Sequence, residues 1–207
     1  MKQITIPITR TSSDIPSIPG TLYGTGKSAV IFSNMDTNDQ QEWNPVVKAL
    51  VPGPCMVVTY DYPGFSLDQS EILEEVVSCV AGMGAERIIL IGASRGGVAS
   101  LKVASRRVHD DRIVAVAALS APIEHEGSVF YTDDELREIS VPKLLINSEE
   151  DDGAEDNRKM LSLFCEPKKL LFYSGDGHGA EIFDGHEEAV VEALLDFINR
   201  SFSRETA

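Results

Sequence analysis

Short apolar runs alternate with amphipathic segments along most of this chain. Eight runs rich in β-branched and apolar residues are predicted strands: residues 2–10, 21–24, 28–34, 55–61, 87–92, 112–121, 141–148 and 168–175. Six segments with helical spacing are predicted helices: residues 39–51, 70–84, 96–108, 132–139, 153–164 and 186–200. Residues 12–20 are rich in Ser and Pro and are predicted to form a turn. Pro45 is expected either in the first turn of its helix or at a break in it.

The order of these elements predicts an α/β fold. From the third strand onward, the strands are almost continuously apolar and helices separate them, which is typical of a parallel sheet with both faces covered. The first two strands are expected to pair as an antiparallel edge. The chain has 207 residues, of which 43% are hydrophobic, and this is enough for one sizeable core. We therefore predict a single doubly wound domain over residues 1–207.

The charge and the cysteine content limit which classes of binding partner and which cellular compartment are expected for this protein. The 33 acidic residues exceed the 18 basic ones, and a net charge of −15 repels phosphate backbones, so no nucleic-acid partner is expected. Three scattered cysteines without a CxxC motif indicate reduced thiols. Because no signal-like or membrane-spanning apolar run is found, we predict a cytoplasmic protein that does not insert in membranes. The pattern gives no indication of an oligomeric state.

A short glycine-rich stretch, GTGKS at residues 24–28, resembles the end of a phosphate-binding loop. That motif needs an earlier glycine where this chain has Thr21, and it must lead into a helix, whereas Lys27 precedes a predicted strand. No GxGxxG motif follows a strand either. ATP, GTP and dinucleotide binding are therefore not expected.

The strongest chemical signal lies at the fifth predicted strand. Residues 87–99 read RIILIGASRGGVA, so the apolar strand ends among small residues and a helix begins at once. Gly92 and Gly96 flank Ser94 at two residues' distance, which fits the G-x-S-x-G nucleophile elbow. This turn holds a hydroxyl above the sheet edge, at a helix N-terminus that favours developing negative charge. The alternative is a tight turn with an idle serine.

A serine needs a base, and His178 is the best candidate among four histidines. It lies in the glycine-flanked loop SGDGHGAE, directly after the last predicted strand, from which it is expected to reach Ser94. His109 is predicted at a helix C-terminus beside two aspartates, where the helix dipole stabilises it, and His186 is predicted on the surface at the start of the last helix. His125 follows the sixth strand, but its place in the chain order does not suit the base.

The histidine in turn needs a carboxylate, and the order serine, acid, histidine directs the search to the seventh strand. Four acids follow that strand in LLINSEEDD, residues 144–152. We select Asp151, three residues beyond Ser148, where a turn brings a side chain back over the sheet. Asp152 remains the alternative, and some of these carboxylates are expected to be merely solvated.

With these residues, the chain resembles the α/β-hydrolases from about residue 20 to residue 200, and most closely the small bacterial hydrolases similar to dienelactone hydrolase. The matching stretches are VIFSNMD, YDYPGFS, GASRGG, VPKLLINSEEDD and GDGHG. The resemblance implies Ser94 as nucleophile, Asp151 as acid and His178 as base. It also implies an oxyanion hole formed by the backbone amides of Arg95 and Met35, with Asn34 as the alternative to Met35.

Two features depart from that family. Ser33 and Asn34 stand where the family often has His-Gly, and the nucleophile is a serine whereas dienelactone hydrolase carries a cysteine. The fold is therefore carried over, and the substrate is not. About twenty residues, 121–140, separate the sixth and seventh strands, which leaves no room for a lipase-like cover.

These observations predict a serine hydrolase that cleaves a small ester, thioester or lactone through an acyl-enzyme on Ser94. If His178 is the base, the reaction rate is expected to rise with pH as one group loses its proton, with an apparent pKa of roughly 6–7. The reaction needs no metal or organic cofactor, and the expected partner is a small-molecule acyl substrate. The alternatives are a non-catalytic binding protein with the hydrolase fold and an acyltransferase that uses the same triad. Phe65, Ile123, Phe130 and Tyr131 are candidates for lining a substrate pocket, although packing is a sufficient role for each.

Overall fold

A computed structural model describes residues 1–9, 15–51, 53–64, 69–106 and 110–204. Its centre is one eight-stranded sheet with the order β1-β2-β4-β3-β5-β6-β9-β10. These strands are β1 Lys2–Pro7, β2 Ser17–Tyr23, β3 Ser28–Ser33, β4 Met56–Tyr60, β5 Arg87–Ala93, β6 Ile113–Leu119, β9 Lys143–Ser148 and β10 Lys168–Tyr173. The mostly parallel α/β sheet with an antiparallel edge is as predicted.

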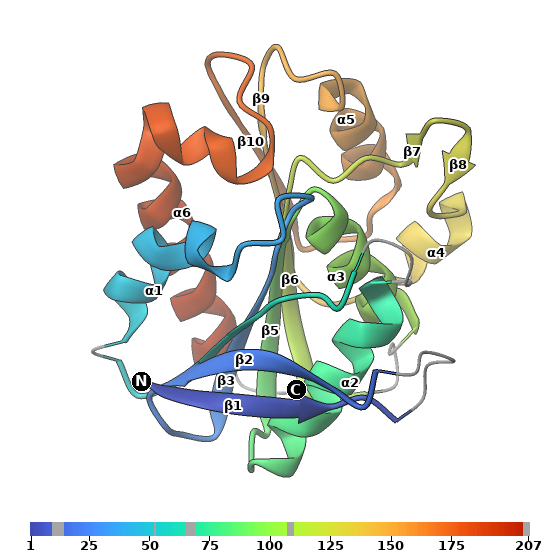
Figure 1. Cartoon of the computed structure of the whole chain (residues 1–207). Coiled ribbons are helices and arrows are strands. Elements are labelled where there is room, and N and C mark those ends of the chain that lie inside the picture. The colour runs from blue at the N-terminus through green and yellow to red at the C-terminus, as the bar shows by residue number, and fades with distance from the viewer. Residues whose placement is uncertain (10–14, 52, 65–68, 107–109, 205–207) are drawn as a thin grey trace.

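Helices cover both faces of the sheet (Figure 1). One face packs against α2 Gln69–Gly82, α3 Arg95–Arg106, α4 Asp133–Glu138 and α5 Ala154–Leu163. The other face packs against α1 Asn44–Leu50 and α6 Phe183–Ser203. Two short 3-10 helices, η1 Gln40–Trp43 and η2 Gly179–Ile182, precede α1 and α6. This layering buries the continuous apolar strands, and it leaves the carboxyl ends of the parallel strands free to carry a site.

The antiparallel edge extends further than the sequence pattern suggests. Strand β2 pairs antiparallel with both β1 and β4. It begins at Ser17, so the predicted turn is wrong for residues 17–20, while residues 12–14 lie outside the described part of the chain. Pro19 lacks an N–H group, but its carbonyl still accepts a hydrogen bond from the amide of Asp61 at 3.3 Å.

Three further local features refine the predicted elements, and the first confirms one of the two expected places for Pro45. Pro45 is the second residue of α1, where its missing N–H costs nothing, and the 3-10 turn η1 precedes it. The last helix begins at Phe183 rather than at residue 186, and His186 interrupts its regular backbone with φ −137° and ψ 24°. A two-residue hairpin joins β7 Glu124–His125 to β8 Ser128–Val129, where Glu126 and Gly127 both have positive φ, as a type I′ turn requires.

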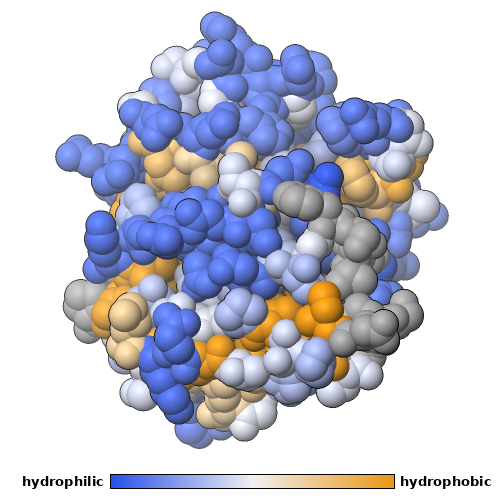
Figure 2. All heavy atoms as spheres, in the orientation of Figure 1, coloured by the Kyte–Doolittle hydropathy of each residue, from blue (hydrophilic) through white to orange (hydrophobic). Residues whose placement is uncertain are grey.

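Hydrophilic side chains cover most of the molecular face seen in Figure 2, in agreement with the high charge of the chain. Within the described residues, no helix is both long and apolar enough to cross a bilayer.

Candidate active site

Ser94 occupies the sharp turn between β5 and α3. Its φ is +49°, a left-handed conformation that non-glycine residues seldom adopt. Its amide still donates to the carbonyl of Leu119 on the neighbouring strand at 2.7 Å. Its own carbonyl accepts the first helical hydrogen bond, from Val98, at 2.9 Å. The turn thus holds the serine tightly by its backbone, while its hydroxyl lines a cleft.

The glycines beside Ser94 are required by close backbone packing. A Cβ on Gly92 would overlap the carbonyl group of Gly96, and a Cβ on Gly96 would overlap the carbonyls of Ser33 and Asn34. The turn can fold this tightly onto the start of α3 only if Gly92 lacks a side chain, and α3 can begin this close to the end of β3 only if Gly96 does. The spacing that singled out Ser94 in the sequence therefore has a steric cause.

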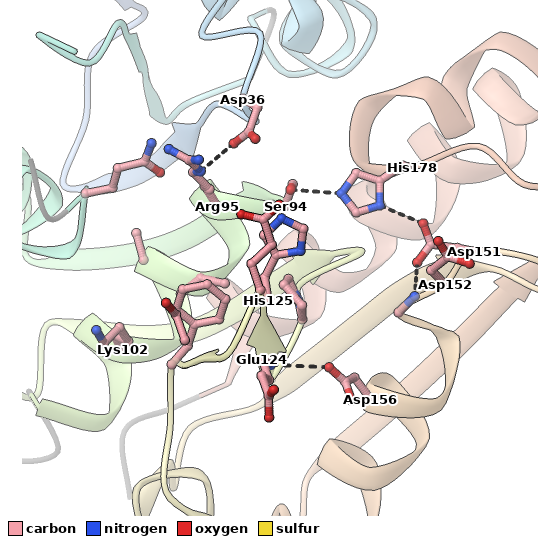
Figure 3. Close-up of a pocket in the computed structure, with 18 of the residues that line it drawn as sticks. Asp36, Ser94, Arg95, Lys102, Glu124, His125, Asp151, Asp152, Asp156 and His178 are labelled. Atoms are coloured by element: carbon pink, nitrogen blue, oxygen red, sulfur yellow. Dashed lines mark hydrogen bonds and ion pairs between the residues drawn. The ribbon is translucent and has the colours of Figure 1, made fainter. Parts of the chain in front are cut away.

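His178 reaches Ser94 from the loop between β10 and η2 (Figure 3). Its Nε2 lies 2.8 Å from Oγ of Ser94, although the two residues are 84 positions apart in the chain. Its Nδ1 lies 2.6 Å from Oδ2 of Asp151. When Nδ1 donates to the carboxylate, Nε2 is left unprotonated and accepts the serine hydroxyl proton in a hydrogen bond.

Asp151 is the carboxylate that faces the histidine. Its side chain is 4% exposed, whereas Asp152 is exposed and lies at the cleft wall. Burial would raise the pKa of Asp151, but hydrogen bonds from His178, Asn147 and Gly153 outweigh it and hold the pKa below its usual value. The hydrogen bond to Asp151 raises the pKa of His178, against the opposing effect of burial. Each member of the pair therefore stabilises the charged form of the other.

Two buried polar residues join this constellation without having been singled out by the sequence. Asn147, in β9, donates from Nδ2 to Oδ1 of Asp151 at 3.1 Å. Ser120, just after β6, donates from Oγ to Oδ1 of Asn147 at 2.6 Å and accepts from the amide of Gly179 at 2.9 Å. The available signal was their position, because both lie where a parallel strand ends at the edge that carries the site.

The candidate oxyanion donors lie in different surroundings. Arg95 is the first residue of α3, and its side chain pairs with Asp36 through Nε and Oδ1 at 2.7 Å. The amide of Met35 donates to Oε1 of Glu42 at 2.8 Å. Asn34, the alternative, is buried, and its Nδ2 donates to the carbonyl of Tyr60 at 2.7 Å. The oxyanion roles of Met35 and Arg95 stay predictions.

Glu42 is a further candidate functional residue, in addition to Asn147 and Ser120, that the sequence did not indicate. Its Oε2 accepts from the hydroxyl of Thr37 at 3.0 Å, while Oε1 accepts from Met35. Burial is the main reason that the pKa of Glu42 is raised to about 7, and the nearby Asp39 and Asp61 act in the same direction. In this structure, Glu42 therefore engages the amide that was predicted to serve the oxyanion hole.

Among the described residues, the other two histidines, His125 and His186, form no hydrogen bond with Ser94. His186 contacts the carbonyl of Ser174 through Nε2 at 2.9 Å and packs against the ring of Tyr173. His125 is exposed in the β7–β8 hairpin and lines the same cleft. His109 lies outside the described residues.

The triad opens into a cleft of about 1230 Å³ whose described wall is strongly acidic. Two lining residues are Lys or Arg, namely Arg95 and Lys102, and both belong to α3. Eight are Asp or Glu: Asp36, Glu124, Glu126, Glu150, Asp151, Asp152, Asp156 and Asp176. In Figure 3, Arg95 and Lys102 lie on one side of the cleft, and Asp151, Asp152 and Asp156 lie on the other.

Of the apolar pocket candidates, Phe130 lines this cleft. Ile123 and Tyr131 are 7% and 3% exposed and belong to the core, so packing accounts for both. Phe65 lies outside the described residues. Residues 121–140 form the β7–β8 hairpin and the short helix α4 rather than a separate cap.

Comparisons with known proteins identify the fold. Neither a family model nor a curated protein matches the sequence. Many solved structures match the fold, among them the esterase domain of a Rhodothermus marinus protein, with a TM-score of 0.77, 18% identity and coverage of 96% of this chain and 98% of that one. Est1E from Butyrivibrio proteoclasticus has a TM-score of 0.75, 16% identity and coverage of 98% and 99%. The monoacylglycerol lipase of Paleococcus ferrophilus has a TM-score of 0.75, 16% identity and coverage of 89% and 99%.

The chain has the α/β-hydrolase fold, as its motifs predicted. At 15–18% identity, this likeness establishes the architecture and leaves the reaction to be argued from the site. The narrower resemblance to dienelactone hydrolase stays a prediction.

Proposed function

We propose that this protein is a serine hydrolase that cleaves a small ester, thioester or lactone through an acyl-enzyme on Ser94. The observation that carries the proposal is the continuous hydrogen-bonded path from Oγ of Ser94 through the imidazole of His178 to Oδ2 of Asp151, with steps of 2.8 and 2.6 Å. The esterase and lipase structures with the same fold support it.

In the first step, Oγ of Ser94 attacks the carbonyl carbon as its proton moves to Nε2 of His178. Asp151, with a lowered pKa, stays ionised and stabilises the imidazolium that forms. The leaving alcohol or thiol takes the proton from Nε2, and the acyl group remains on Ser94. A water molecule then gives a proton to Nε2 of His178 and attacks the carbonyl carbon of the acyl-enzyme. As the bond to Oγ breaks, His178 returns the proton to Oγ, which releases the carboxylic acid and regenerates Ser94.

Negative charge on the tetrahedral intermediate needs hydrogen-bond donors near the helix end. The amide of Arg95 directly follows the nucleophile at the N-terminus of α3, where the helix dipole adds to the effect. The amide of Met35 is the proposed second donor, and it serves this role once its hydrogen bond to Glu42 is shared or released. Each such donor contributes about 3–4 kcal/mol to transition-state stabilisation in comparable enzymes.

The test is a panel of p-nitrophenyl esters of short and long acids, with matched thioesters, assayed on wild type and on Ser94→Ala. Turnover by wild type and its loss in a folded Ser94→Ala variant are expected, because the variant lacks the attacking oxygen. A fluorophosphonate probe should label wild type at Ser94. If wild type is neither labelled nor active, a non-catalytic binding role is favoured. Products trapped with added alcohols or amines would instead indicate an acyltransferase.

A further inference from the structure

A closed ring of hydrogen bonds ties the triad acid to the histidine loop. It runs from Ser120 to Asn147, from Asn147 to Asp151, from Asp151 to His178, and across one peptide bond to Gly179, whose amide returns to Ser120. The two residues that contribute side chains to the ring from outside the triad are almost inaccessible, with Ser120 1% exposed and Asn147 0% exposed. Most buried polar groups in proteins are hydrogen-bonded, and in this ring the side chains of Ser120 and Asn147 each both donate and accept.

Backbone amides, which can only donate, fix the directions of the hydrogen bonds that Ser120 and Asn147 make in the ring. The amide of Ser148 contacts the side chain of Asn147 at 2.8 Å, so the atom that faces it must be the carbonyl Oδ1. The side-chain NH2 group of Asn147, with its Nδ2 atom, therefore faces Asp151. The amide of Gly179 in turn donates to Oγ of Ser120, which directs the serine proton to Asn147.

As a result, the two carboxylate oxygens of Asp151 bind different donors. Oδ1 accepts from Asn147 at 3.1 Å and from the amide of Gly153 at 2.7 Å. Oδ2 is left to His178. Two donors on one oxygen hold the carboxylate plane in place and favour its ionised form.

The same strand ends hold the histidine loop on both sides of His178. Ser120 binds the amide of Gly179, and Ser148 donates from Oγ to the carbonyl of Gly177 at 2.7 Å. Ser120 has a φ of +48°, a conformation that costs energy for a non-glycine residue and persists only when its surroundings impose it. Both flanks of the base are thus fastened to β6 and β9, the strands that also carry the ring.

We propose that Asn147 and Ser120 are positioning residues of the active site, which set the orientation and ionisation of Asp151 and fix the loop that presents His178. This proposal rests on the proposed function, because positioning matters only if the triad reacts. Neither residue belongs to the described lining of the cleft that would receive the substrate. Their loss should therefore lower kcat and leave KM nearly unchanged.

The main variant is Asn147→Leu, which keeps the approximate volume and removes both the donor and the acceptor. We expect kcat for p-nitrophenyl acetate to fall about 10-fold or more, because Asp151 loses a buried hydrogen bond and its fixed plane. Ser120→Ala should act in the same direction, since it frees the Gly179 amide. The fluorophosphonate labelling rate of Ser94 should fall in parallel with kcat.

Asn157 supplies the matched control. It is also 0% exposed, and its Nδ2 donates to the carbonyl of Ala121 at 2.7 Å, but it forms no hydrogen bond with a described member of the triad. Asn157→Leu should lose stability in urea unfolding to a degree similar to Asn147→Leu while it keeps kcat. Equal losses of kcat in the two variants would mean a general effect of burying leucine there, and would overturn the proposal.

Asn147→Asp gives a readout that packing alone would not produce. While the introduced carboxyl is protonated, its O–H can replace the lost donor to Asp151, and once it ionises, two carboxylates face one another. The ratio of its kcat to that of wild type should therefore fall as pH rises. A ratio independent of pH would contradict the proposed role.

Failure of this inference differs from failure of the proposed function. If wild type hydrolyses the ester and is labelled at Ser94, but Asn147→Leu and Ser120→Ala match it within about twofold in kcat, a change too small for a lost buried hydrogen bond, then only the positioning role is wrong. If wild type shows neither activity nor labelling, both are wrong.

Discussion

The Nδ1 atom of His178 lies 2.6 Å from Oδ2 of Asp151, although 27 positions separate the two residues in the chain. Asp152, the next residue, is exposed at the cleft wall. This difference makes a direct prediction. Asp151→Asn should lower kcat by about 10³- to 10⁴-fold, because the histidine loses the partner that fixes its tautomer.

Asp152→Asn is the comparison variant for this prediction. It removes a carboxylate of the same size from the adjacent position, where no hydrogen bond to His178 exists among the described contacts. Its kcat should stay within about tenfold of wild type, since exposed charges interact weakly. Steady-state measurements of kcat for both variants test which aspartate is the triad acid. A greater loss in Asp152→Asn than in Asp151→Asn would show that the acid is misassigned.

The pH dependence of activity should reflect the raised pKa of His178. The hydrogen bond to Asp151 favours the protonated imidazole, which cannot act as the base. kcat/KM should therefore rise with pH and level off above a pKa that is higher than the ordinary histidine value of about 6.5. Rate profiles of wild type, together with NMR titration of the ring in Ser94→Ala, measure this pKa. A rise of kcat/KM centred at or below pH 6 would contradict the proposal that the hydrogen bond to Asp151 raises the pKa of His178.

Glu42 should make the stability of the protein depend on pH. Its pKa in the folded state is about 7, above its ordinary value of 4.5, mainly because of burial. The folded state therefore favours the protonated form, and the associated stability is fully present below about pH 4.5 and is lost as pH rises through about 7.

Glu42→Gln removes this titration while keeping an acceptor for the amide of Met35. Relative to wild type, the variant should gain about 1–3 kcal/mol in its free energy of unfolding between pH 5 and pH 8. Urea unfolding at the two pH values measures the gain. Glu187→Gln, on the exposed surface of α6, is the control and should show no such gain. Parallel behaviour of the two variants would argue against a half-buried Glu42 whose protonated form the fold favours.

The acidic wall of the cleft should discriminate among substrates by charge. Eight carboxylates against two basic residues in the described lining create a negative potential that repels anions. Among p-nitrophenyl esters of equal length, we expect kcat/KM to be about 3- to 10-fold lower for a carboxylate-bearing acyl chain than for a trimethylammonium-bearing one. Added salt should narrow the difference through screening. Equal rates at low salt, or faster cleavage of the anionic ester, would be inconsistent with this prediction.

Much of the fold was predictable from local pattern. The alternation of apolar strands and amphipathic helices indicated the parallel sheet and its antiparallel edge, because burial on both faces requires continuous apolar runs. The first part of the second strand, residues 17–20, and the hairpin at residues 124–129 were missed. Their pairing depends on neighbours distant in sequence, which outweigh local turn signals.

The approach of His178 to Ser94 followed from topology, since the carboxyl ends of parallel strands meet at one edge of the sheet. The roles assigned to Ser94, Asp151, His178, Arg95 and Met35 stay predictions until they are measured. The choice of Asp151 over Asp152 as the residue in contact with the base could not be made from sequence with certainty, because adjacent residues in a turn point in different directions.

The sequence by itself determined which residues could carry chemistry: a serine between glycines at a strand end, and a histidine and acids after later strands. Only the tertiary structure decided which of them touch. It closed the ring through Ser120 and Asn147, and it placed Glu42 on the amide of Met35. The reason is physical: residue type and spacing fix local backbone geometry, whereas a hydrogen bond between distant residues depends on packing to within a few tenths of an ångström.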